Sequence, residues 1–308
     1  MKRILFAFLL SFLFSALYAQ EDADTLKPWK IGGDVSLTFS QVSFTNWAAG
    51  GDNSFSGLAT FNIFADYTKD KHIWNNFLTT AYGLQKLKKD PYEKTQDKLD
   101  IMSNYGYEAF KNWYYSANLS FTTQYDKGYD SDIEDSLVSD LLSPGYVLAG
   151  VGLTYQPNDN FYVAISPLAY KMTIVNNQNL ANLGSYGLDP AEFDTAGNVI
   201  KNANKIRNEF GASIKAMFKK EVVKNVILWT YLELFSNYLE DPQNIDVKWD
   251  VIIDFKINNW LTANLQTNLI YDHDIKVTDK DGNVGPRTQF KQAFGLGLAY
   301  RFGYEKKE

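Results

Sequence analysis

Few residues in this chain could take part in covalent catalysis. The sequence holds two histidines and no cysteine, which excludes thiolate nucleophiles, disulfide bonds and cysteine-ligated metals. His273 lies beside Asp272, and hydrolases use a histidine together with a carboxylate. Neighbouring side chains on a strand point to opposite faces, so these two are not expected to pair. The sequence therefore predicts no catalytic residue, no cofactor and no metal site, and we expect the chain not to be an enzyme.

Charged side chains recur at every second position in parts of the sequence, which indicates one charged face on a strand. In residues 245–257 the odd-numbered positions are all apolar, whereas most even-numbered positions are Asp or Lys. Residues 113–126 repeat the alternation with Ser, Asn, Thr and Gln on the polar face. A period of two is typical of a β-strand with one apolar and one polar face. The alternation is long enough for the about 9–11 residues that a tilted strand needs to cross a bilayer.

Twelve segments of the sequence show this alternation, and they predict an all-β fold. The two least regular segments, 73–86 and 226–238, carry apolar residues on both faces. The twelve segments are 30–41, 54–67, 73–86, 97–109, 113–126, 146–156, 161–173, 207–218, 226–238, 245–257, 260–272 and 288–302.

The connections between these segments alternate between short turns, such as 111–112, and long loops, such as 174–206. Aromatic residues flank the short turns, as Phe110 and Trp113 do, which is typical of a membrane–water interface. We therefore predict a transmembrane antiparallel up-and-down β-barrel of about 12 strands, with short periplasmic turns and long outer loops. An even number of strands places both ends of the barrel on the periplasmic side.

Residues 1–19 predict a cleavable signal peptide, because two basic residues precede an apolar run and the small residue Ala19 precedes the expected cleavage site. Residues 20–308 then form one barrel domain, expected in the outer membrane of the cell. The net charge of −6 argues against nucleic acid as a partner. Expected partners are outer-membrane lipid and, during assembly, the barrel-insertion machinery. An envelope protein is a further candidate partner.

A distinctive motif follows the signal peptide. It contains Trp29, then Gly32-Gly33, and then Asn46-Trp47-x-x-Gly50-Gly51. This resembles the opening signature of a domain-of-unknown-function family of Bacteroidota outer-membrane β-barrel proteins. The resemblance covers the whole mature chain. It implies a barrel in the outer membrane, and it implies no activity, since the family has no assigned biochemical role.

The polar face of each strand would line the lumen, and its charges are candidate site residues. Buried charges need a partner or water. They could form a network that fills and stiffens a narrow barrel, or they could line a hydrated path that mildly favours cations. A barrel of about twelve strands falls between filled barrels and open porins, so the number of strands does not decide whether the lumen is filled or open. The candidate lumen charges are Asp34, Asp246, Lys248, Asp250, Asp254, Lys256 and Arg301.

Two further features are candidate sites in the lumen. The loop with Asn46, Trp47, Gly50 and Gly51 is apolar and glycine-rich. It could fold inward as a constriction, or it could be an outer loop with its tryptophan at the interface level. The seventh and ninth predicted strands carry large apolar residues on their inner faces. These could hold a lipid-like or aromatic ligand, could pack against an inward loop, or could reflect reversed faces in 226–238. This candidate apolar lumen patch consists of Tyr162, Tyr170, Trp229, Tyr231 and Phe235.

The polar and charged inner face favours a passive channel or small-solute transport barrel. The alternative is a non-transporting structural or interaction barrel within an envelope assembly, which the narrow bore and the inward loop would support. An outer-membrane hydrolase is a distant third hypothesis, because it rests on His273 alone.

Overall fold

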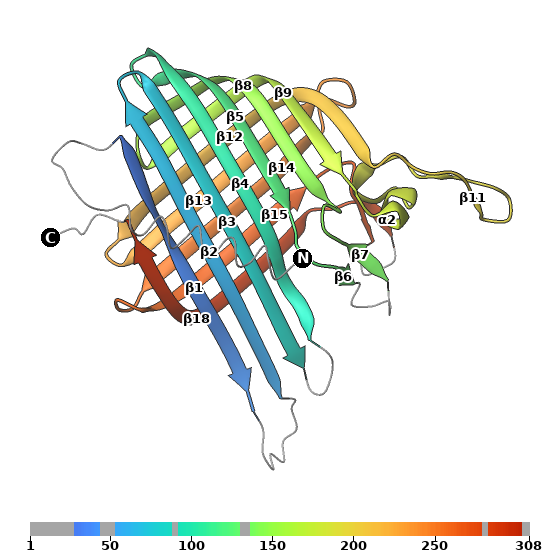
Figure 1. Cartoon of the computed structure of the whole chain (residues 1–308), viewed down its shortest axis with the longest axis horizontal. Helices are drawn as coiled ribbons and strands as arrows, with labels where there is room; N and C mark the ends of the chain where they lie inside the picture. Colours follow the sequence, from blue (N-terminus) through green and yellow to red (C-terminus); the bar gives the residue numbers. More distant parts are fainter. Residues whose placement is uncertain (1–27, 44–52, 88–91, 130–135, 279–282, 304–308) are drawn as a thin grey trace.

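The fold is a closed barrel of antiparallel strands (Figure 1). The computed structural model describes residues 28–43, 53–87, 92–129, 136–278 and 283–303. Within these residues twelve strands form the barrel, which confirms the predicted fold class. The strands are β1 (Trp29–Val42), β2 (Ser54–Lys69), β3 (His72–Leu87), β4 (Glu93–Phe110), β5 (Trp113–Thr123), β8 (Gly145–Asn158), β9 (Phe161–Ile174), β12 (Ile206–Val223), β13 (Val226–Asn237), β14 (Ile245–Lys256), β15 (Leu261–Tyr271) and β18 (Gln289–Phe302).

The two faces of the barrel wall follow the alternation of the sequence. In β5, Tyr115 and Leu119 are 64% and 49% exposed and point outward, whereas Ser116, Asn118 and Ser120 are buried and point into the bore. A strand sends successive side chains to opposite faces. Apolar residues therefore cover the outside of the barrel, and polar residues fill much of its inside.

The two ends of the barrel differ in their connections. At one end the strands join through short turns, in which Asp70 and Asn112 adopt the left-handed conformation that tight hairpins require. Beside these turns Trp29 packs against Tyr67 and Trp74, with ring centroids 5.2 and 5.6 Å apart. We call this the short-turn end. Its turns and its aromatic rings lie where the sequence predicts them.

The opposite end, the long-loop end, carries small elements that the sequence analysis does not predict. Val175, Leu180, Ala181 and Leu188 form a small apolar core there, and Leu137 packs against it. Figure 1 shows α2, β6 and β7 gathered at this end. No helix in the described part of the chain has the length and apolarity to cross a membrane. The small elements are β6 (Gly128–Tyr129), β7 (Leu137–Ser139), α2 (Gln178–Asn182), η1 (Ser185–Gly187), β10 (Glu192–Phe193), β11 (Val199–Lys201), β16 (Lys276–Thr278) and β17 (Val284–Pro286).

The barrel closes where β1 pairs with β18. Six residue pairs join these strands, from Gly33 opposite Phe302 to Thr38 opposite Gly297. A side chain at Gly297 would collide with the backbone of Leu37, so the two strands approach closely. β1 pairs with β2 along its whole length. This closing seam is the shortest ladder of the barrel within the described residues.

One predicted site residue lies on the other side of the wall. The sequence predicts that Tyr170 faces the lumen, but Tyr170 pairs with Phe210, which is 54% exposed on the outer surface. The cause is a β-bulge in β9. Val151 of β8 pairs with Leu168 and Leu153 pairs with Ile165, so β9 uses three residues where β8 uses two. The extra residue turns the remainder of β9 over. Lys171, instead of Tyr170, therefore points into the bore.

Candidate functional site

The bore is the candidate site, and ion pairs cross its middle. β4 and β14 lie on opposite walls, since they are equally far apart in both directions around the ring of strands. Lys98 Nζ on β4 lies 3.0 Å from Asp250 Oδ2 on β14. Lys248 Nζ on β14 lies 3.4 Å from Asp100 Oδ1 on β4. Lys98 also pairs with Asp100 on its own strand at 2.6 Å. We call these four side chains the central charge cluster.

The central charge cluster is buried and held by hydrogen bonds. Asp100 and Asp250 are 3% and 4% exposed. Asn268 Nδ2 donates to Asp250 Oδ1 at 2.7 Å, and Lys248 Nζ donates to Thr122 Oγ1 at 3.0 Å. Buried charges are tolerated when both their ionic and their hydrogen-bonding partners are in place. Two predicted lumen charges, Lys248 and Asp250, therefore lie at the centre of the bore.

A second buried network connects three walls of the barrel. Lys215 on β12 lies 3.6 Å from Glu233 on β13 and donates to Ser120 Oγ on β5 at 3.0 Å. Ser120 Oγ and Tyr231 OH both donate to Glu233 Oε2, at 3.2 and 2.8 Å. β5 is separated from β12 by β8 and β9 in the ring, so these contacts span the inside of the barrel. The alternation of the sequence predicts that Tyr231 faces the lumen, but it carries no information about these partners.

Aromatic rings also meet across the bore. Phe77 on β3 stacks on Trp229 on β13, with centroids 5.7 Å apart and planes at 21°, and these strands lie on opposite walls. Trp229 stacks in turn on Tyr231, with centroids 6.2 Å apart. We call these three rings the ring stack. Trp229 and Tyr231 thus occupy the inner face, as the sequence predicts, and the faces of 226–238 are not reversed.

The remaining predicted residues of the apolar patch lie apart from the ring stack. Phe235 is 3% exposed and clusters with Leu148 and Ala169, and Lys171 Nζ lies 5.3 Å from the centre of its ring. Tyr162 faces the bore and lines a cavity at the short-turn end. The predicted patch is therefore divided along the bore and does not form one continuous surface.

Toward the long-loop end, one lysine is surrounded by carboxylates. Lys171 Nζ lies 2.6 Å from Asp246, 3.0 Å from Asp272 and 3.7 Å from Glu209. Asp246 is a predicted lumen charge, but its partner Lys171 is missed because period-two counting ignores the bulge. Pro167 is the sequence signal that could have found it, since a proline inside a strand marks an edge or a bulge.

Three other predicted lumen charges gather near the short-turn end. Asp34, Asp254 and Arg301 line a small cavity of about 40 Å³. Asn62 Nδ2 donates to Asp34 Oδ2 at 3.0 Å, and Arg301 Nη2 donates to Thr262 Oγ1 at 3.4 Å. These residues come from β1, β2, β14, β15 and β18, so the closing seam brings the two ends of the barrel sequence into one site.

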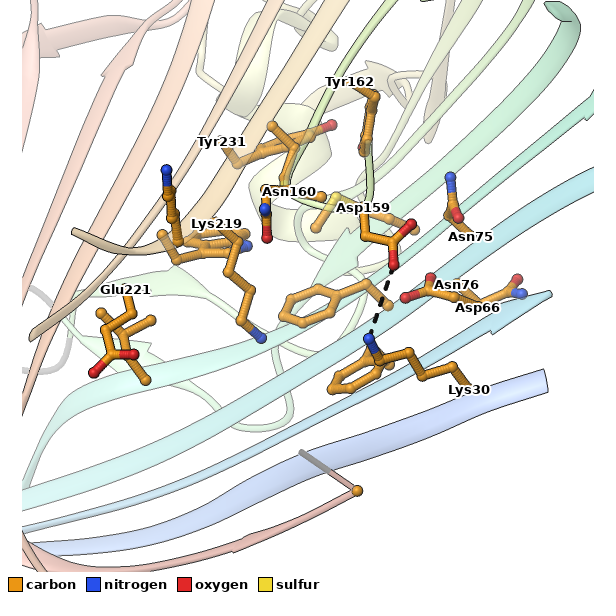
Figure 2. Close-up of a pocket in the computed structure, with 18 of the residues that line it drawn as sticks. Lys30, Asp66, Asn75, Asn76, Asp159, Asn160, Tyr162, Lys219, Glu221 and Tyr231 are labelled. Atoms are coloured by element: carbon orange, nitrogen blue, oxygen red, sulfur yellow. Dashed lines mark ion pairs between the residues drawn. The ribbon is translucent and has the colours of Figure 1, made fainter. Parts of the chain in front are cut away.

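A larger cavity opens at the short-turn end (Figure 2). It encloses about 1430 Å³. Asp159 and the predicted lumen charge Lys256 lie at its mouth, and the ring stack lines its inner end. Figure 2 shows Lys30 and Asp159 meeting beside the mouth, with Nζ 3.8 Å from Oδ2. We call this cavity the vestibule.

Two other groups of candidate residues remain. His273 Nδ1 lies 3.3 Å from the Tyr271 hydroxyl, whereas the Asp272 carboxylate accepts a hydrogen bond from Lys171. This agrees with the expectation that the neighbouring aspartate and histidine do not pair. The candidate constriction lies outside the described residues, and its members are Asn46, Trp47, Gly50 and Gly51.

The comparison with protein families finds one matching segment. Residues 39–129 match the model of a protein family of unknown function, DUF3078. The match includes the Asn46-Trp47-x-x-Gly50-Gly51 segment and begins after Trp29 and Gly32-Gly33. The resemblance to a family of unknown function is therefore confirmed over these residues. No curated protein matches the chain.

Solved structures with a similar fold are outer-membrane barrels. The translocator domain of the autotransporter NalP from Neisseria meningitidis is 9% identical, with a TM-score of 0.34 and coverage of 98% of this chain and 96% of that one. The NanC porin is 8% identical, with a TM-score of 0.35 and coverage of 88% and 98%. An outer-membrane channel of the COG4313 group from Pseudomonas putida F1 is 11% identical, with a TM-score of 0.38 and coverage of 92% and 98%.

Proposed function

We propose that this chain is an outer-membrane β-barrel whose bore is closed by its own side chains, and that it acts as a non-transporting interaction barrel of the envelope. The apolar outer face and the aromatic rings at the short-turn end support a membrane location. The closed ring supports it too, because every strand has a partner on both sides and no sheet edge meets lipid. With short turns in the periplasm, the vestibule opens toward the periplasm and the long loops face outward.

The closure of the bore is the observation that carries this proposal. The central charge cluster joins β4 to β14, and the ring stack joins β3 to β13, so opposite walls meet twice. Open porins instead keep an aqueous channel between their walls. A solute passing this point would have to separate buried ion pairs, and a buried charge without its partner is strongly unfavourable. The described bore therefore favours binding and contact over free passage.

A passive channel is the second candidate function, and the vestibule favours it. This cavity occupies the short-turn half of the bore and ends at the ring stack. In a channel of this kind, the central charge cluster would be the gate between the vestibule and the long-loop end.

Planar-bilayer recordings distinguish these two functions. We expect purified wild-type protein to show no stable openings at any voltage. The double variant Lys98→Ala, Lys248→Ala leaves Asp100 and Asp250 to repel each other, so it should open cation-selective conductance. Lys201→Ala, in the exposed β11 hairpin, is the control and should stay silent. Stable openings of the wild-type protein would overturn the interaction role and favour a channel.

A further inference from the structure

The vestibule has a charge opposite to that of the chain as a whole. The chain carries a net charge of −6, yet seven basic and three acidic residues border the vestibule. Lys215, deep in the cavity, faces Glu233 at 3.6 Å. Asp34 and Asp254 lie in the small cavity that also borders the vestibule residue Lys219. Lys224 and Lys256 lie near the mouth together with the three acidic residues, whereas Lys219 lies further in, beside the ring stack.

The inner end of the vestibule offers flat aromatic surface. Phe77 and Trp229 of the ring stack line it, and so does Phe64, whose ring centre lies 5.1 Å from Lys219 Nζ. Figure 2 shows the Lys219 side chain extending into the cavity. Aromatic rings prefer offset stacking on other rings, and an ammonium group attracts carboxylates. A flat ring and a cation within one cavity suit a ligand that is both aromatic and anionic.

Two buried amides in the same lining have unmet hydrogen-bonding capacity. Asn104 and Asn118 are 5% and 6% exposed and line the vestibule. Asn118 Nδ2 donates to Ser166 Oγ at 2.7 Å, and Asn104 Oδ1 accepts from Thr154 Oγ1 at 3.4 Å. Asn104 Nδ2 and Asn118 Oδ1 have no hydrogen-bond partner among the described residues. Both atoms have almost no accessible surface, and the two asparagines lie opposite each other in β4 and β5, so these amides are part of the wall of the vestibule.

We propose that the vestibule is a binding site for a small aromatic carboxylate. The ligand's ring packs against the ring stack at the inner end, and the carboxylate interacts with Lys219 and the basic residues nearer the mouth. The cavity exceeds the roughly 300–1000 Å³ of ordinary ligand pockets, so it holds such a molecule together with water. This proposal rests on the proposed function in one respect only, namely that ligands enter the vestibule from the periplasm.

Calorimetric titration of the barrel in lipid nanodiscs tests this proposal, because both barrel ends are then accessible. The probes are 2-naphthoate, the neutral 2-naphthalenemethanol and the cationic 2-naphthylmethylammonium, with empty nanodiscs as the baseline. We expect saturable binding of 2-naphthoate, about tenfold tighter than the alcohol, since one charge-assisted hydrogen bond contributes that much. The cation should bind most weakly.

Single substitutions locate the site. Lys219→Gln should weaken 2-naphthoate binding about tenfold and leave the neutral alcohol unchanged. Trp229→Leu should weaken both probes, because it removes the central ring of the ring stack against which both pack. Lys201→Gln removes a charge from the exposed β11 hairpin and should change nothing. If Lys219→Gln fails to fold, Lys256→Gln at the mouth replaces it.

Equal affinity for the anionic and cationic probes would overturn the proposal, as would unchanged 2-naphthoate binding in both lysine variants. Neither result depends on conductance. A barrel that conducts ions yet binds 2-naphthoate selectively would overturn the closed-bore function and support the site. A barrel that conducts no ions and binds no probe would overturn the binding site and leave the closed-bore function standing.

Discussion

Single residues hold the bore closed through partners that are distant along the chain. Lys98 and Asp250 are 152 positions apart, and Lys248 and Asp100 are 148 apart. The period-two pattern predicts that Lys248 and Asp250 point inward, but it carries no information about which charge faces them. That choice is made by the ring order of the strands, which places β4 opposite β14. The direction of these side chains could therefore be predicted from the sequence, whereas their partners could not.

The central charge cluster should contribute strongly to stability. Asp100→Ala leaves Lys98 and Lys248 without the carboxylate between them, so the free energy of unfolding should fall by roughly 3–5 kcal/mol. Glu192→Ala breaks an ion pair with Lys201 of 2.9 Å whose partners are 63% and 74% exposed, and it should have almost no effect. Urea denaturation of both variants in lipid vesicles measures the difference. Equal losses in the two variants would show that the cluster adds nothing beyond a surface pair.

At the scale of elements, the strands could be predicted far better than their irregularities. Each of the twelve barrel strands overlaps a predicted segment, since alternation is a local property of the sequence. The bulge in β9 breaks that property, so strict alternation predicts the wrong face for Tyr170 and does not place Lys171 in the bore. The small elements of the long loops, such as α2, have too few residues to show a period. Their stability comes from tertiary contacts such as that of Leu180 with Val175.

Because of the bulge, Leu168 of β9 lies on the outer face of the barrel, and this can be tested. Leu168 and Ile200 are both 68% exposed, but Leu168 lies on the barrel wall and Ile200 lies on a loop hairpin. Leu168→Lys should place a charge against lipid and destabilise the inserted barrel by up to about 2–4 kcal/mol, depending on depth. Ile200→Lys should be tolerated because its surroundings are aqueous. Refolding yield into vesicles measures both, and full tolerance of Leu168→Lys would indicate that Leu168 faces the bore.

At the scale of the whole molecule, the closing seam is the weakest join of the barrel. Its six residue pairs are fewer than those of any other ladder of the barrel within the described residues. A disulfide made by Val35→Cys and Tyr300→Cys, which lie opposite each other in the seam, should slow unfolding in urea. A disulfide made by Ile63→Cys and Leu78→Cys, opposite each other in β2 and β3, is the control and should slow it less. The native chain has no cysteine, so both crosslinks form cleanly. Equal unfolding rates would show that the barrel does not open first at the seam.

The seam also sets the order in which the barrel can assemble. Every other ladder joins strands that follow one another in the barrel sequence, so it can form as soon as its two strands exist. The contact of β1 with β18 needs the two ends of the barrel sequence to meet, and it carries the largest entropic cost of loop closure. Until it forms, β1 and β18 each present a row of unpaired backbone groups, which is a template for pairing with another chain. A delay in this final step would therefore leave an open sheet that is prone to aggregation. Rapid pairing of β1 with β18 removes both unpaired edges.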